Sequence, residues 1–164
     1  MKLTRLLCGA LMFLAASTCL ASEGDVLIDL GPSVAFVGGG GRKQPSFGGQ
    51  LGAYYGINDM TDLGLFYRAD IAEPKGGGDS TITHAGGISS WLTTYEGGIR
   101  PQVGGQLGFA RAHSNSFLYA ALSARALIEL QTHLRIFVGA SGGGYFGSHG
   151  AGFVAADLGL QLLF

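Results

Sequence analysis

The residues that could do acid–base, nucleophilic or metal chemistry are few in this chain and widely separated. The histidines occur at long, irregular intervals, unlike the short spacings of metal ligands, at His84, His113, His133 and His149. His113 is followed by Ser114, and Glu129 lies further along, so one stretch holds a base, a hydroxyl and a carboxylate. We place His113 in a loop and Glu129 near the opposite rim of the fold, which would keep them apart. The sequence therefore predicts no catalytic residue, no cofactor and no metal site.

Two glycine runs, residues 38–41 and 76–78, differ from phosphate-binding loops. Neither is followed by Lys-Ser or Lys-Thr, and neither opens a helical segment. Charged residues make up 13% of the chain, and the formal net charge is −1. Because a nucleic-acid partner needs a basic face, the composition predicts no such partner.

Residues 1–21 have the layout of a secretory signal peptide, with basic residues, an apolar core and small residues in that order. The core is shorter than the roughly 20 apolar residues of a membrane-spanning helix. We expect cleavage after Ala21, which removes Cys8 and Cys19 and leaves residues 22–164 as one domain without disulfides. A retained helical anchor and lipidation at Cys19 are the alternatives.

The segments that must position any functional group alternate apolar and polar residues with a period of two, as β-strands do. We predict eight strands, over residues 26–36, 47–57, 62–71, 91–99, 103–110, 117–130, 134–140 and 152–164. The segment 117–130 contains good helix formers, but we assign a strand because its neighbours all alternate. Longer glycine-rich or polar loops are predicted after the first, third, fifth and seventh strands, and tight turns after the second, fourth and sixth.

The charged residues of the predicted strands all lie on the more polar of the two strand faces. Unpaired buried charges are costly, so a buried polar face predicts an ion-pair network. Its predicted members are Arg68, Asp70, Glu96, Arg100, Arg125, Glu129, Arg135 and Asp157, with Asp29 and Asp62 on the same face. Alternation alone leaves open whether this face meets water or lines a lumen.

Two features favour a membrane barrel with the polar face inside. Glycines recur on that face among four aromatic residues, and small neighbours would make room for these rings in a narrow lumen: Tyr54, Phe66, Tyr119 and Phe137. The apolar face carries aromatics near strand ends, like the girdles of membrane barrels, at Phe36, Phe47, Tyr55, Tyr67, Trp91, Phe109 and Phe164. The predicted fold class is an all-β, eight-stranded, antiparallel up-and-down transmembrane β-barrel.

The C-terminal sequence DLGLQLLF resembles the signal by which bacterial outer-membrane proteins are recognised by their barrel assembly machinery. A polar residue, a glycine, an apolar residue and a terminal aromatic match at Asp157, Gly159, Leu162 and Phe164. With the signal peptide and the loop pattern, the chain resembles the small eight-stranded, porin-like outer-membrane barrels of the OmpA and OmpX type. The resemblance implies a monomer in the bacterial outer membrane, in contact with outer-membrane lipids and lipopolysaccharide.

A filled, ion-paired lumen predicts a structural or surface-interaction role. One alternative is a lipid-modifying enzyme, because outer-membrane lipid A deacylases use a His, a Ser two residues later and a downstream Glu. In this chain Asn115 stands two residues after His113, so the pattern is broken. The other alternative is an exported soluble β-barrel that binds an apolar ligand.

Overall fold

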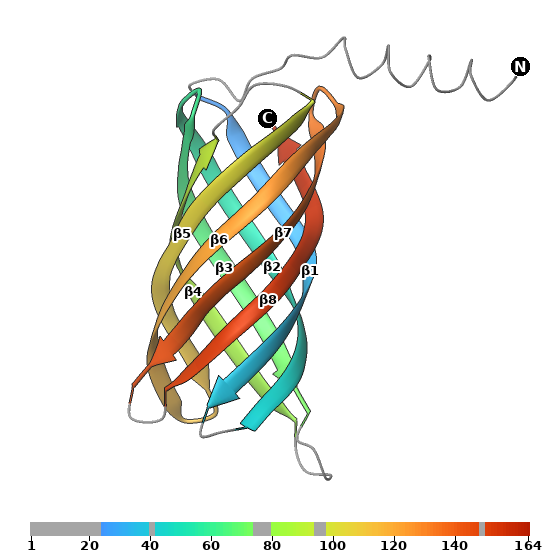
Figure 1. Cartoon of the computed structure of the whole chain (residues 1–164). Helices are drawn as coiled ribbons and strands as arrows, with labels where there is room; N and C mark the ends of the chain where they lie inside the picture. Colours follow the sequence, from blue (N-terminus) through green and yellow to red (C-terminus); the bar gives the residue numbers. More distant parts are fainter. Residues whose placement is uncertain (1–23, 40–41, 74–79, 94–97, 148–149) are drawn as a thin grey trace, which may run out of the picture.

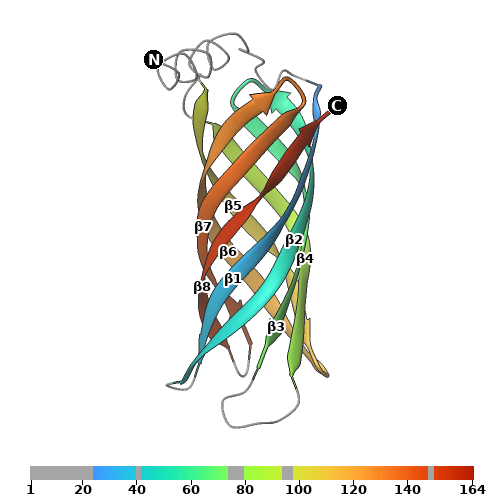
Figure 2. The same cartoon turned by 90° about the vertical axis from the view of Figure 1, so that its right-hand side faces the viewer.

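Eight antiparallel strands form a closed barrel (Figures 1 and 2). The computed structural model describes residues 24–39, 42–73, 80–93, 98–147 and 150–164. The strands are β1 Val26–Gly39, β2 Arg42–Asn58, β3 Thr61–Ala72, β4 Thr81–Thr93, β5 Ile99–Ala112, β6 Asn115–Gln131, β7 Leu134–Phe146 and β8 Ala151–Leu163. Each pairs with the next, and β8 pairs with β1, so no sheet edge stays open. The predicted eight-stranded up-and-down barrel is confirmed.

The strands place apolar side chains outside and the charged face inside. Leu30, Leu65 and Leu122 point outward and are exposed, whereas Asp29 and Arg68 are buried in the lumen. An exposed aliphatic belt around a polar interior is the pattern of a membrane barrel. The strands are 12–17 residues long, which exceeds the roughly 9–11 residues that a tilted strand needs to cross a bilayer. No helix among the described residues is long and apolar enough to cross a membrane.

Glycines on the inner face make room for buried rings. A Cβ atom at Gly52 would overlap the Tyr54 ring, and a Cβ at Gly159 would overlap the Phe137 ring. Tyr54 and Phe137 are both buried in the lumen. The prediction that glycines leave space for inward aromatic rings is therefore confirmed at these positions.

The fourth strand differs from its prediction. It runs from Thr81 to Thr93, whereas we predicted residues 91–99. The segment from Thr81 to Ser90 is rich in threonine, glycine and serine, so its two faces differ little in hydrophobicity and alternation gives a weak signal. Its backbone pairs with β3 and β5 throughout, and this pairing keeps it in the sheet.

The predicted contrast between long loops and tight turns is wrong in part, because the strands extend into all four predicted loops. The residues between strands at this end, hereafter the loop end, are 40–41, 73–80, 113–114 and 147–150. At the opposite end, hereafter the turn end, they are 59–60, 94–98 and 132–133. Only the β3–β4 connection remains clearly longer than the turns at the opposite end. In the other three connections, glycine and polar residues predicted to be in loops continue the strand pairing instead. His113 adopts a left-handed φ of 54° in the β5–β6 turn.

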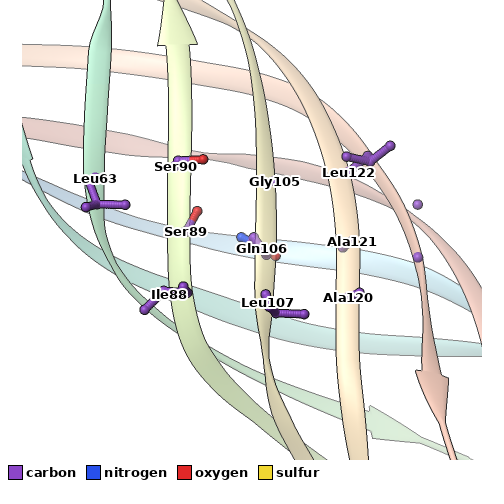
Figure 3. A pocket seen from close by; sticks show the side chains of 12 residues that line it. Leu63, Ile88, Ser89, Ser90, Gly105, Gln106, Leu107, Ala120, Ala121 and Leu122 are labelled. Carbon is purple, nitrogen blue, oxygen red and sulfur yellow. The ribbon is translucent and has the colours of Figure 1, made fainter.

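A groove of about 490 Å³ runs over the outside of the barrel across β3 to β7 (Figure 3). Small residues such as Ser90, Gly105 and Ala120 line it, with larger apolar side chains of the outer face around them at Leu63, Ile88, Leu107 and Leu122. The outward-facing leucines show that this groove lies on the aliphatic belt.

Candidate functional site

A chain of hydrogen bonds centred on Arg125 crosses the lumen. Arg125 donates to the Asp29 carboxylate through Nη1 and to Gln102 Oε1 through Nε at 2.7 Å. Gln102 Nε2 in turn donates to Thr93 Oγ1 at 2.8 Å and to Asp62 Oδ2 at 3.4 Å. These residues come from β6, β1, β5, β4 and β3. The chain therefore ties together strands that lie on different sides of the barrel.

The same chain continues from Asp29 to two further strands, β8 and β7. Gln161 Nε2 of β8 donates to Asp29 Oδ1 at 2.9 Å, and Arg135 Nη1 of β7 donates to Gln161 Oε1 at 3.1 Å. Arg135 and Gln161 are each 1% exposed. We call this set the Arg125 network, with members Asp29, Asp62, Thr93, Gln102, Arg125, Arg135 and Gln161.

Aromatic rings enclose the guanidinium of Arg125. Its Cζ atom lies 3.9 Å from the centroid of the Trp91 ring and 5.0 Å from that of Phe137. A cation over a ring face is stabilised by the quadrupole of the ring, and more strongly in a site without water. Arg125 is therefore held by a carboxylate, an amide and two ring faces at once.

A second polar cluster surrounds Arg68 nearer the loop end. Arg68 Nε donates to Asp70 Oδ2 at 2.7 Å, and Nη1 lies 3.5 Å from Asp157 Oδ1. Ser141 Oγ donates to Asp157 Oδ2 at 2.9 Å, and Ser33 Oγ lies 3.4 Å from Asp70 Oδ1. This Arg68 cluster links β1, β3, β7 and β8.

A separate ion pair lies toward the turn end. Arg100 Nη2 donates to Glu129 Oε2 at 3.1 Å, and both side chains are buried. Replacing one partner of such a pair with a neutral residue would leave the other charge buried and uncompensated.

Clusters of apolar and aromatic residues lie above and below the polar layers. At the turn end the cluster is Leu27, Tyr54, Trp91 and Leu163. At the loop end Tyr119 stacks on Phe153 at 5.6 Å and lies 5.3 Å from Phe66 and 5.6 Å from Tyr145. A cavity of about 180 Å³ lies near the loop end, where Phe117, Tyr145 and Asp70 line it. Side chains thus occupy the lumen in successive layers and leave this cavity near the loop end.

The structure brings most of the proposed network residues into three groups. Asp70 and Asp157 contact Arg68, and Glu129 contacts Arg100. Arg125 and Arg135 belong to the Arg125 network instead, where Arg125 pairs with Asp29 and Gln102 and Arg135 donates to Gln161. Glu96 lies outside the described residues. The sequence reasoning placed Asp29 on this face but did not identify Gln102 and Gln161 as the links. The sequence feature that could have identified them is a polar amide side chain at an inward-facing position.

The prediction that Trp91 faces lipid is wrong. Trp91 is 5% exposed and lies in the lumen. With β4 extending back to Thr81, Trp91 falls on the inward face and pairs with Gly104 of β5. A Cβ at Gly104 would come within 2.5 Å of the indole, so the missing side chain provides its space. Stacking on Arg125 completes the environment of the ring.

The groups that could have formed a catalytic site are far apart. His113 lies in the β5–β6 turn, whereas Glu129 lies near the other end of β6. His84, which we predicted in a connector, lies in β4 on the outer face, and its Nδ1 is 2.6 Å from the Tyr67 hydroxyl. His149 lies outside the described residues. Within the described part of the chain, no group of three or more His, Cys, Asp or Glu side chains could hold a metal ion.

The fold and the filled lumen define the class of small eight-stranded transmembrane β-barrels. The structure resembles Neisserial surface protein A (NspA), with a TM-score of 0.76 and 13% identity over 87% of this chain and 100% of that one. It resembles OprG of Pseudomonas aeruginosa, with a TM-score of 0.61 and 11% identity over 88% and 99%. It also resembles Ail of Yersinia pestis, with a TM-score of 0.57 and 15% identity over 87% and 99%. No protein-family model and no curated protein sequence matches the chain.

Proposed function

We propose that this chain is a bacterial outer-membrane barrel with a closed lumen and a structural or surface-interaction role. The observation that carries the proposal is the Arg125 network, whose buried side chains cross the barrel from β3 to β8. An eight-stranded barrel is only wide enough for side chains to fill its interior. Ail has also been solved in complex with the heparin analogue sucrose octasulfate, which supports surface interaction as a use of this fold.

Conductance tests the closed lumen. In planar bilayers the purified protein is expected to give no resolved single-channel current above the bare-membrane background, because an interior this narrow, crossed by ion-paired side chains, should block the passage of ions. A wide porin reconstituted in parallel serves as the positive control. Reproducible current steps from folded protein, identified by heat-modifiable gel migration, would contradict the closed lumen.

The two alternatives fit the geometry less well. A deacylase-like enzyme needs its base and its carboxylate at one site, whereas His113 lies in the turn before β6 and Glu129 lies near the far end of that strand. A soluble apolar-ligand carrier would place its aliphatic face inside. Here Leu65 and Leu122 are 63% and 77% exposed, while arginines occupy the interior. We therefore propose a non-enzymatic membrane protein.

The route to the membrane is part of the proposal. We propose that residues 1–21 are a signal peptide cleaved after Ala21 and that residues 22–164 form the barrel domain. In the outer membrane the protein would be a monomer in contact with lipids and lipopolysaccharide. The proposed assembly signal is Asp157, Gly159, Leu162 and Phe164, in the strand that closes the barrel on β1.

Replacing Phe164 with alanine tests the assembly signal separately from stability. Its side chain is 72% exposed, so the purified variant is expected to refold in detergent as the wild type does. In cells we expect the folded, heat-modifiable form to decrease several-fold in outer-membrane fractions. Phe146→Ala is the matched control, because Phe146 is an outward aromatic at the loop end and is 56% exposed. Equal levels of the two variants in the membrane would refute the assignment.

A further inference from the structure

A row of hydrogen-bond donors lies on the outside of the barrel at the loop end. In the strand register His84 of β4 stands opposite Arg111 of β5, and Arg111 stands opposite Ser116 at the start of β6. All three residues are exposed. Side chains directly opposite each other in antiparallel strands lie about 5 Å apart at Cβ. An imidazole, a guanidinium and a hydroxyl therefore form one continuous donor row.

The row lies at the depth expected for lipid headgroups. The outward positions of β5 before Arg111 extend from Ile99 to Phe109, both well exposed. At about 3.4 Å per residue and a tilt of about 40°, this stretch covers roughly 25 Å, the height of the apolar band of a membrane barrel. Arg111 is the next outward residue, so its charge falls just past the band.

Local contacts orient the side chains of His84 and Arg111. The Tyr67 hydroxyl lies 2.6 Å from His84 Nδ1, and the two rings stack with centroids 6.0 Å apart. When the Tyr67 hydroxyl donates to Nδ1, the imidazole carries its proton on Nε2 and can donate it to a ligand. Arg111 Nε donates to the His113 carbonyl at 3.4 Å, which leaves the two terminal nitrogens for a ligand. A guanidinium with free terminal nitrogens binds phosphate in a bidentate manner.

One step toward the membrane centre, the neighbouring row is apolar and has a gap. Tyr67 of β3 stands opposite Gly86 of β4, and Gly86 stands opposite Phe109 of β5. The nearest atoms to a Cβ built at Gly86 lie 3.4 and 3.9 Å away, so a side chain could be added there without displacing a neighbour. Tyr67 and Phe109 therefore flank a position that has no side chain, directly beneath the donor row, and we call this position the notch.

The distribution of charge along the chain favours an anionic partner at this end. Four of the Lys and Arg residues after position 21 belong to the lumen groups described above. Among the other described residues, Arg42, Lys43 and Arg111 lie at the loop end together with the single acid Glu73, whereas Asp25 and Asp59 lie at the turn end. In the bacterial outer membrane, where we place this protein, short turns face the periplasm and loops face outward. The loop end therefore lies at the outer leaflet.

We infer that His84, Arg111 and Ser116 bind a phosphate group of an outer-leaflet lipid of the lipid A type, with an acyl chain in the notch between Tyr67 and Phe109. The inference rests on the proposed outer-membrane location. A lipid fits better than a soluble polyanion because the donors are continuous with an exposed apolar notch. The proposed function includes contact with lipopolysaccharide but assigns no residues to it, and this inference supplies those residues.

Binding of fluorescent bis-phosphorylated lipid A to the protein purified from membranes in neutral detergent tests this site. We expect the wild type to bind it at least tenfold more tightly than dephosphorylated lipid A. Arg111→Gln, and more so Arg111→Gln with His84→Gln, should weaken binding roughly tenfold or more, since hydrogen bonds to charged groups are the strong ones. Gly86→Leu should also weaken binding, because it fills the notch without changing charge.

His133→Gln is the matched control, because His133 is an exposed histidine in the turn-end connection, and it should bind lipid A as the wild type does. Heat-modifiable migration of each variant shows whether it is folded. Equal affinity for the two lipids, or wild-type affinity in the folded double variant, would overturn the site. So would Arg111-dependent binding of sucrose octasulfate without binding of lipid A. None of these failures would alter the conductance result, so they are distinguishable from failure of the closed lumen.

Discussion

Replacing Arg125 with methionine is expected to lower the free energy of unfolding by about 3–5 kcal/mol. The variant leaves Asp29 buried without its ion-pair partner and removes the donor to Gln102. It also removes the cation above the Trp91 ring. Urea unfolding in phosphatidylcholine vesicles measures the effect, and Trp91 reports it directly because it is the one tryptophan of the chain.

The double variant Asp29→Asn/Arg125→Met separates the cost of an orphaned charge from loss of packing. With both charges removed, we expect it to recover much of the lost stability, because neutral replacements of buried pairs are often tolerated. Arg111→Gln is the exposed control and should stay within about 0.5 kcal/mol of the wild type. A folded Arg125→Met variant as stable as the wild type would show that the Arg125 network does not hold the lumen together.

Replacing Leu122 with arginine is expected to cost about 2–4 kcal/mol, because its side chain would face lipid near the bilayer midplane. Leu122 is 77% exposed and lies near the middle of β6. In water an exposed Leu→Arg change of this kind would be nearly neutral. Unfolding free energies of variants folded in vesicles measure the cost.

Leu130→Arg is the matched control on the same strand and the same face. Leu130 lies one residue from the turn-end terminus of β6 and is 47% exposed. Near the interface the cost of arginine should fall to about 0–1 kcal/mol. Equal costs at the two positions, or no cost at either, would contradict a membrane-spanning orientation of β6.

The barrel could be predicted because its strands differ sharply between faces. Along β3, for example, Leu63 and Leu65 alternate with Asp62 and Gly64, and the structure follows this pattern. In β4, threonine, serine and glycine occupy both faces, so neither the start of the strand nor the orientation of Trp91 could be read from hydrophobicity. An aromatic ring also fits either environment, since the lumen and the lipid interface both accept rings.

The sequence could predict which residues of the candidate site share the inward face of the barrel, but it could not predict which of them contact each other. The inward arginines and acids could be identified because a charged side chain on the aliphatic face would be strongly destabilising. Their partners depend on the stagger of eight strands around the barrel, which the period of one strand does not encode. Gln102 and Gln161 became central because that stagger places their amides between Arg125, Asp29 and Arg135.

Outside β4, the sequence by itself determined which strand face meets lipid and which faces inward, because a period of two places alternate residues on opposite faces of a strand. The sequence also contains the C-terminal segment, ending at Phe164, that resembles an outer-membrane assembly signal. Only the tertiary structure decided that Arg125 meets Asp29 across the lumen and that Arg111 stands beside His84 on the outside. Both pairings arise from the register between strands, which closure of the barrel sets for all eight strands together.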